Sequence, residues 1–235
     1  MKQQKINKEQ NKVIIFDSGT LISFSMNGLT YLLRRLKEKF SGKFIITYKV
    51  KKEVIDTPLN IKRFELEAIM IRTLLDEKIL ELPDSLGFKE SDLQKEYDLI
   101  LQTANSTFSA EGRDIHIVDI GEASCIALSK ILNERGIKNV IALDERTTRL
   151  LIERPENLKS IFEGRMNTKV TIKEKNAELF RNLKVIRSTE LSYVAYKKGL
   201  VDLKGKEVLD GLLYALKSKG AAISGDEIEE IKRIG

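Results

Sequence analysis

Two hydrophobic patterns alternate along the chain: short continuous apolar runs, and longer segments with apolar residues at helical spacing. The short runs are mostly β-branched or aromatic and predict strands at Val13–Phe16, Phe44–Tyr48, "IHIV" (115–118), Val140–Leu143 and Lys184–Ser188. A further short apolar run is "ILEL" (79–82). The longer segments predict helices at Thr20–Lys39, Ile61–Lys78, Ser91–Phe108, Ile120–Arg135, Arg146–Arg154 and Glu190–Lys198. Strands that alternate with helices in this way predict an α/β fold around a central parallel sheet.

Neither an internal repeat nor a low-complexity linker divides the chain, so we expect one domain over residues 1–235. Within it, residues 1–12 are expected to be a flexible tail, 84–118 a helical insertion and 205–235 a helical extension. A helical segment with an interruption at 167–172 is expected over 156–182. The apolar face of the extension is either core or the seam of a homodimer; it consists of Val208, Leu209, Leu212, Leu213 and Leu216.

Composition narrows the functional classes. An apolar content of 42% suits a folded core, and without a run of about eighteen apolar residues or a secretory signal we expect a cytoplasmic protein without membrane association. The single cysteine, Cys125, excludes an internal disulfide, and with the single histidine, His116, it is too little for a Cys/His zinc site. Any metal ion must therefore be bound by carboxylates.

The net charge of +6 and the pI of about 9.2 suit a polyanionic partner such as nucleic acid. Lys- and Glu-rich proteins of thermophiles have a similar balance without binding nucleic acid. Charge alone leaves both interpretations open.

Acidic residues follow the predicted strands. Asp17 and Asp144 end two strands, Glu53 lies in a helical turn (Val50–Ile55) beyond a third, and Asp119 and Glu122 begin a helix. Because the carboxyl ends of parallel strands form one edge of a sheet, these acids are expected to converge there. Such a cluster needs a cation, and Mg²⁺ or Mn²⁺ prefers oxygen ligands. The chemistry indicated is hydrolysis of a phosphodiester by an activated water.

Other interpretations of these residues stay open. "FDSGT" is similar to the aspartic protease signature, but this chain is rich in helices and has one copy. It also resembles the haloacid-dehalogenase motif DxDGT, except that Gly19 replaces the second carboxylate. Asp17, Asp119, Glu122 and Asp144 could simply cap helices, and Glu53 could lie on a solvated helix face.

Several segments together resemble the PIN-domain family of metal-dependent nucleases, which includes toxins of toxin–antitoxin pairs. The similar segments are "VIIFDSGTLI", "TYKVKKEVID", "DIGEASCIALSK", "NVIALDERTTR" and "KVIRSTELSYVAYKKGLV". They cover about 13–82 and 117–201, and 84–116 has no counterpart in the family.

The resemblance implies a PIN-like three-layer α/β/α fold and a Mg²⁺- or Mn²⁺-dependent ribonuclease, with RNA and an antitoxin protein as partners. Asp17, Glu53, Glu122 and Asp144 match the family's acidic positions, and Asp119 is a neighbouring metal ligand. From their positions, Arg146 and Arg149, one helical turn apart, and Lys51 and Lys52, beside Glu53, are expected to contact RNA phosphates. The alternatives are a catalytically inactive PIN-fold module that binds RNA or protein, and a phosphohydrolase that forms an aspartyl-phosphate.

Overall fold

The computed structural model describes residues 12–233, so the expected tail lies outside the described residues except for Lys12. The fold is α/β with a central five-stranded parallel sheet in the order β3-β2-β1-β6-β8. Its strands are β1 (Lys12–Phe16), β2 (Lys43–Ile45), β3 (Leu80–Glu81), β6 (Lys138–Ala142) and β8 (Val185–Ile186). All five correspond to predicted apolar runs, which confirms the predicted parallel sheet.

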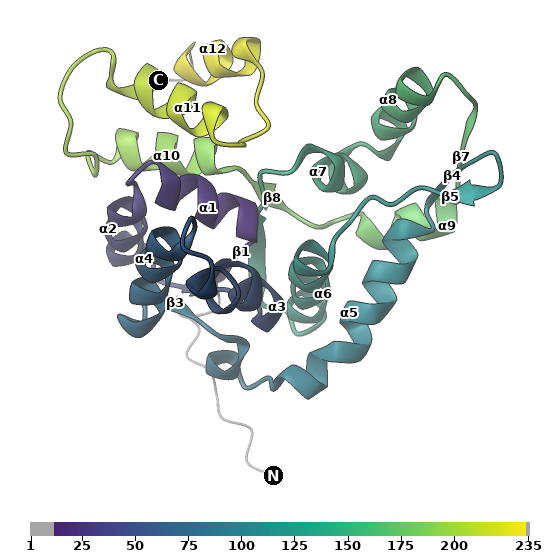
Figure 1. Cartoon of the computed structure of the whole chain (residues 1–235), viewed down its shortest axis with the longest axis horizontal. Helices are drawn as coiled ribbons and strands as arrows, with labels where there is room; N and C mark the ends of the chain where they lie inside the picture. The colour runs from purple at the N-terminus through teal and green to yellow at the C-terminus, as the bar shows by residue number, and fades with distance from the viewer. Residues whose placement is uncertain (1–11, 234–235) are drawn as a thin grey trace.

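Helices cover both faces of this sheet and complete a three-layer arrangement (Figure 1). One layer consists of α1 (Ser18–Met26), α2 (Thr30–Lys39), α4 (Glu65–Asp76) and α10 (Ser188–Lys197). The other contains α3 (Tyr48–Lys51), α5 (Glu90–Asn105) and α6 (Ile120–Glu134). The central strands are apolar on both sides because they are sandwiched: Ile15, Phe16 and Ile141 are fully buried.

The segment expected to form one helix at Thr20–Lys39 forms two, α1 and α2. The chain turns at Gly28, whose φ of +67° favours glycine, and the Leu29 N–H donates to the Phe24 carbonyl at 2.8 Å. The hydrophobic spacing continued across this turn because both helices bury a face against the same core. The pattern therefore did not reveal the break.

The segment expected to be a helical insertion also contains strands. After α5 come β4 (Phe108–Ala110) and β5 (Arg113–Asp114), and both join β7 (Val170–Ile172) in an antiparallel sheet of order β5-β4-β7. The interruption expected at 167–172 therefore contains β7, between α8 (Pro155–Met166) and α9 (Glu174–Ala177). "IHIV" is not a strand, because its backbone instead binds the Asn105 side chain.

The helical extension forms α11 (Val208–Ser218) and α12 (Gly225–Arg233). The apolar face of α11 is buried within this chain, as the core interpretation predicted. Part of it forms a small separate core, whose members are Leu209, Leu213, Ile223, Ile228 and Ile231. The helical turn expected at Val50–Ile55 continues from α3 as a turn of π-helix over Lys52–Asp56. Within residues 12–233, no helix is long and apolar enough to cross a membrane.

Candidate active site

Asp17 and Asp144 follow two neighbouring strands of the central sheet. Phe16 of β1 is paired with Ala142 of β6, and the Asp17 N–H donates to the Ala142 carbonyl at 3.0 Å. Asp144 lies two residues beyond Ala142, so both acids lie at the carboxyl edge of the sheet. Asp17 is close enough to Asp144 for the charge of one to raise the pKa of the other.

Asp17 caps α1, as the simpler interpretation predicted, but the cap uses only one of its oxygens. Oδ2 accepts a hydrogen bond from the Gly19 N–H at 3.2 Å. Oδ1 is buried and has no hydrogen-bond partner among the described residues. The side chain is nearly fully buried, and this burial raises the pKa of Asp17 to about 7; the Glu53 and Asp144 charges add to the effect.

Asp144 has a similar arrangement against α10. Its Oδ1 accepts a hydrogen bond from the Ser188 N–H at 2.7 Å, while Oδ2 is buried without a partner in the described part of the chain. Burial raises the pKa of Asp144, and the bonds from Ser188 and the Ser23 hydroxyl and the charge of Arg187 oppose the rise. Asp144 is therefore a second buried carboxylate with one oxygen available.

Glu122 connects α6 to α7 (Arg146–Glu153). Its Oε2 accepts hydrogen bonds from the Asp119 N–H at 3.0 Å and from the Thr148 hydroxyl at 2.9 Å. Burial raises the pKa of Glu122 to about 8, and the charge of Asp17 contributes. The Glu122 carboxyl therefore holds a proton at neutral pH when nothing else compensates its charge.

Glu53 lies against the beginning of α6, at Gly121. A Cβ on Gly121 would lie 2.4 Å from Glu53 Oε2, so only glycine leaves room for this approach. Burial raises the pKa of Glu53; the Ser18 hydroxyl and the Gly121 N–H lower it, and the Asp119 charge raises it. The glycine of the "GEA" segment thus has a steric role beside the acids.

Asp119 differs from the other acids because its side chain is 80% exposed. Its Oδ1 binds His116 Nε2 at 2.8 Å, and its backbone N–H donates to Glu122. The structure therefore brings Asp17, Asp144 and Glu122 together as buried groups, with Glu53 half-buried beside them. Asp119 lies at the rim, on the surface.

Most of the buried side-chain oxygens that have no hydrogen-bond partner among the described residues lie at this sheet edge. Besides the two from Asp17 and Asp144, they belong to the amino-terminal halves of α1 and α10: Thr20, Ser188, Thr189 and Ser192. Buried polar atoms are rarely left unpartnered in folded proteins. Their concentration here indicates a site that is completed by something outside the chain.

The donor chemistry fits a hard divalent cation. Among residues 12–233 no group of three or more His, Cys, Asp or Glu side chains is arranged to hold a metal ion. Mg²⁺, however, is commonly bound by one or two carboxylates and keeps several waters. Two adjacent buried carboxylates with one free oxygen each, Asp17 and Asp144, meet that requirement.

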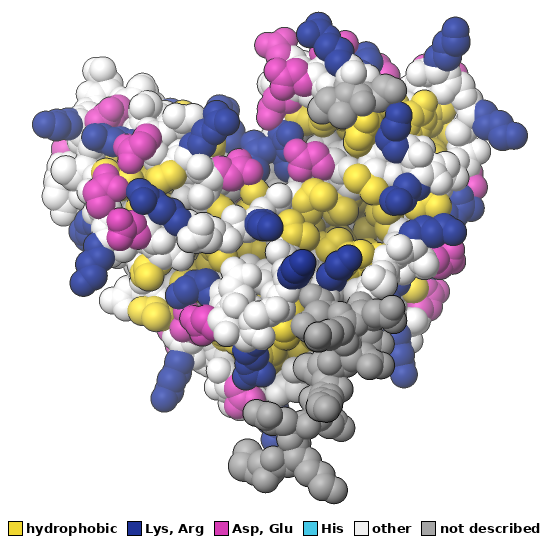
Figure 2. All heavy atoms as spheres, turned by 180° about the vertical axis from the view of Figure 1, so that it is seen from behind, with side chains coloured by type: hydrophobic (Ala, Val, Ile, Leu, Met, Phe, Trp, Pro, Cys, Tyr) yellow, Lys and Arg dark blue, Asp and Glu magenta, His cyan; other side chains and the backbone are white. Residues whose placement is uncertain are grey.

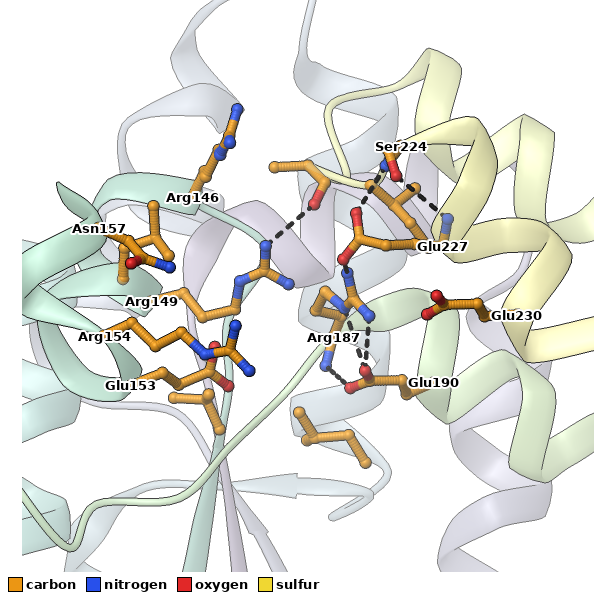
Figure 3. Close-up of a pocket in the computed structure, with 15 residues that line it drawn as sticks. Arg146, Arg149, Glu153, Arg154, Asn157, Arg187, Glu190, Ser224, Glu227 and Glu230 are labelled. Carbon is orange, nitrogen blue, oxygen red and sulfur yellow. Dashed lines mark hydrogen bonds and ion pairs between the residues drawn. The ribbon is translucent and has the colours of Figure 1, made fainter. Parts of the chain in front are cut away.

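The basic residues expected to contact phosphate lie in two places. Lys51 forms an ion pair with Asp56 at 2.6 Å, and Lys52 is exposed nearby. Arg146 and Arg149 instead line a pocket beside α7, where Arg149 is buried (Figure 3). The two arginines therefore lie close to Asp144, and the lysines lie close to Glu53.

Sequence reasoning missed the residues that hold the acids in place. Thr148 binds Glu122, and Ser188 binds Asp144, yet neither lies near its partner in the sequence. Ser188 ends a predicted strand just before a predicted helix, which was the only indication of a role. No family model matches the chain, and neither a curated protein nor a solved structure matches it.

Proposed function

We propose that this protein is a PIN-like, Mg²⁺- or Mn²⁺-dependent ribonuclease that acts in the cytoplasm. The observation that carries the proposal is the pair of buried carboxylates, Asp17 and Asp144, at the ends of neighbouring strands. Each leaves one oxygen without a partner among the described residues, within electrostatic reach of the other. Two such groups are unfavourable together unless a cation compensates their charge.

Asp17 and Asp144 would hold the cation through these free oxygens. A bound divalent cation lowers the pKa of water and neutralises charge that develops on a phosphoryl group. Glu122 is held by the Thr148 hydroxyl and the Asp119 N–H at Oε2, and its raised pKa, about 8, suits transfer of a proton near neutral pH. Glu53 supplies a further negative charge beside the start of α6, where Gly121 admits it.

A polyanionic substrate agrees with the charge of the chain and with the arginines beside the acids. The net charge is +6, and Arg146 and Arg149 line a pocket that adjoins the segment of Asp144. Guanidinium groups bind phosphate oxygens in a bidentate manner. RNA is the substrate class that the sequence resemblance suggests.

The proposal is tested by cleavage of single-stranded and structured RNA with Mn²⁺, Mg²⁺ or EDTA. We expect wild-type cleavage with either cation, no cleavage in EDTA, and a rate lowered at least about a hundredfold in Asp17→Asn and Asp144→Asn. Asp76→Asn is the matched control, because Asp76 is an exposed carboxylate at the end of α4. Equal cleavage by wild type and Asp17→Asn would refute the proposal.

Two further measurements, RNA binding and a search for a covalent adduct, separate the two alternatives. The finding that no described group of three acids is arranged around a metal ion favours a catalytically inactive module, which would bind RNA without cleaving it. A phosphohydrolase would form a covalent phosphate adduct on Asp17. Detection of that adduct by mass spectrometry, with hydrolysis of small phosphate esters, would replace the nuclease proposal.

A further inference from the structure

A pocket of about 1040 Å³ lies between α7 and α12, beside the acidic cluster. Its walls come from α7 and the start of α8, from β8 and α10, and from the chain that leads into α12 (Figure 3). The surface is hollowed between the lobe of α8 and the lobe of α11 and α12, with basic and acidic side chains at the base (Figure 2). The volume is at the upper end of the range for small-molecule sites.

Arg149 is a buried cation in this pocket without a carboxylate partner. Only 9% of its surface is exposed, and its Nε has no hydrogen-bond partner within the described chain. The one hydrogen bond that its side chain forms within residues 12–233 runs from Nη2 to the Ala222 carbonyl at 3.4 Å. Burial and the charge of Arg187 lower the pKa of Arg149, and the charges of Glu153, Glu227 and Glu190 oppose this without forming an ion pair with it among the described residues. Guanidinium groups stay protonated in proteins. An unpaired buried cation of this kind is stabilised by an anion.

Arg187, in the same pocket, shows the opposite arrangement. It forms ion pairs with Glu190 at 2.8 Å and with Glu227 at 2.6 Å, which join α10 to α12. Its charge is therefore already compensated within the protein. The contrast identifies Arg149 as the arginine that is left for a ligand.

Two further arginines and two glutamates define the class of ligand. Arg146 and Arg154 line the pocket, are exposed, and form no ion pair with any residue in 12–233. Glu153 and Glu230 line it as well, and their carboxylates accept hydrogen bonds but repel a polyphosphate. A ligand with one phosphate group and several hydroxyl or amino donors matches this mixture, and a nucleotide has both.

We propose that this pocket binds one phosphate-bearing nucleotide, with the phosphate on Arg149 and Arg154 and the sugar or base toward Glu153 and Glu230. This inference rests on the proposed function in one respect: if the protein cleaves RNA, the bound nucleotide is one unit of the RNA strand that reaches the acidic cluster.

The pocket and the cluster share one segment of the chain. The Ala222 N–H donates to the Asp144 carbonyl at 3.3 Å, and the Ala222 carbonyl accepts from Arg149. Arg187 directly precedes Ser188, which binds the Asp144 carboxylate. A strand held in the pocket is therefore held next to the acids.

The test measures binding without cleavage. A short single-stranded RNA with a 3′ fluorophore and a 5′ phosphate is titrated with protein in EDTA, and its anisotropy is recorded. We expect Arg149→Met to raise Kd about tenfold or more, since a hydrogen bond between charged groups is lost. Arg154→Ala should raise Kd by a smaller factor. Arg165→Ala, an exposed arginine of α8 that does not line the pocket, should leave Kd unchanged.

Competition identifies the source of the nucleotide. Displacement of the RNA by adenosine monophosphate would show that a free nucleotide fills the pocket. Displacement by unlabelled RNA alone would show that the unit must belong to a chain, and either result supports the pocket. Melting temperatures verify that the variants fold. If Arg149→Met does not fold, the Kd of Arg154→Ala tests the proposal, because Arg154 is exposed and its substitution should not disturb the fold.

The proposal is overturned if Arg149→Met and Arg154→Ala both fold and bind RNA and adenosine monophosphate as Arg165→Ala does. This failure is distinct from failure of the proposed function. If wild type binds through Arg149 but never cleaves RNA with Mn²⁺, the nuclease proposal fails and the pocket stands. If cleavage requires Asp17 while neither Arg149→Met nor Arg154→Ala changes Kd or KM, the pocket proposal fails and the nuclease proposal stands.

Discussion

Raising the pH of the cation-free protein from 5 to 8 is expected to destabilise its fold. The pKa of Asp17 is raised by burial from its ordinary value of 3.8 to about 7, and that of Glu122 from 4.5 to about 8. The unfolded chain recovers the ordinary values, so in this pH range it has released protons that the folded state still holds. The contribution of these protons to the free energy of unfolding is fully present below the ordinary pKa values. It is lost as the pH rises through the folded values.

The magnitude follows from the two pKa values of Asp17. Their difference corresponds to about 4 kcal/mol in total, of which about 2 kcal/mol is lost between pH 5 and pH 7. This conversion needs no reduction for solvent screening, because only 2% of the side chain is exposed. The contribution of Glu122 is not simply added, since the charge of Asp17 raises the pKa of Glu122.

The assay is urea unfolding in EDTA at a series of pH values, for wild type and for Asp17→Asn. The variant keeps the shape of the side chain but cannot ionise, so near pH 7.5 it should be more stable than wild type by about 4 kcal/mol. The difference should shrink toward pH 4. Mn²⁺ at ten times its Kd should stabilise wild type by about 1.4 kcal/mol at pH 7.5 and should not stabilise Asp17→Asn.

A flat dependence of wild-type stability on pH between 5 and 8 would refute this reasoning. So would a variant that is less stable than wild type at pH 7.5, because Asp17 would then be ionised and compensated within the chain. Asp76→Asn is again the control, since this exposed side chain should leave the pH dependence unchanged.

Three further substitutions test the contacts around the acids and the pocket. Gly121→Ala should displace the flexible end of Glu53 and lower RNA cleavage about as much as Glu53→Gln does, with a melting temperature close to that of wild type. Thr148→Val should lower the unfolding free energy by about 1 kcal/mol in urea unfolding. It should also move the pH profile of cleavage to higher pH, because the hydrogen bond from Thr148 lowers the pKa of Glu122 and its removal lets this pKa rise. Arg187→Met should lower the unfolding free energy by about 2 kcal/mol, because its two glutamate partners lose their counter-charge while staying partly exposed to water. A change below about 0.5 kcal/mol for the last variant would show that these ion pairs do not stabilise the fold.

The strands and the positions of Asp17 and Asp144 were predictable because the information is local. A short apolar run that ends at an acid predicts both a buried strand and the edge at which its acid lies. The same reasoning placed Glu122 in the first turn of a helix. These features need no knowledge of which strands are neighbours.

The contacts that complete the site were not predictable in this way. Thr148 reaches Glu122, and Ser188 reaches Asp144, only because the sheet order places β1, β6 and β8 side by side. The pairing of β4 with β7 likewise joins short strands that are distant in sequence, and strands of three residues have little hydrophobic pattern. The Asp119 side chain lies on the surface, where it contacts His116, and the helix start alone did not indicate this.

The helical extension is part of the candidate site and not an appendage to it. Ala222 contacts Asp144 on one side and Arg149 on the other, and Arg187 joins α10 to α12 through Glu227. Because the α12 lobe forms one wall of the arginine pocket, its position determines how far Arg149 is buried and how strongly an anion is needed there. A change that loosens α12 should therefore weaken nucleotide binding before it alters the buried acids, whose side chains are held by α1, α7 and α10.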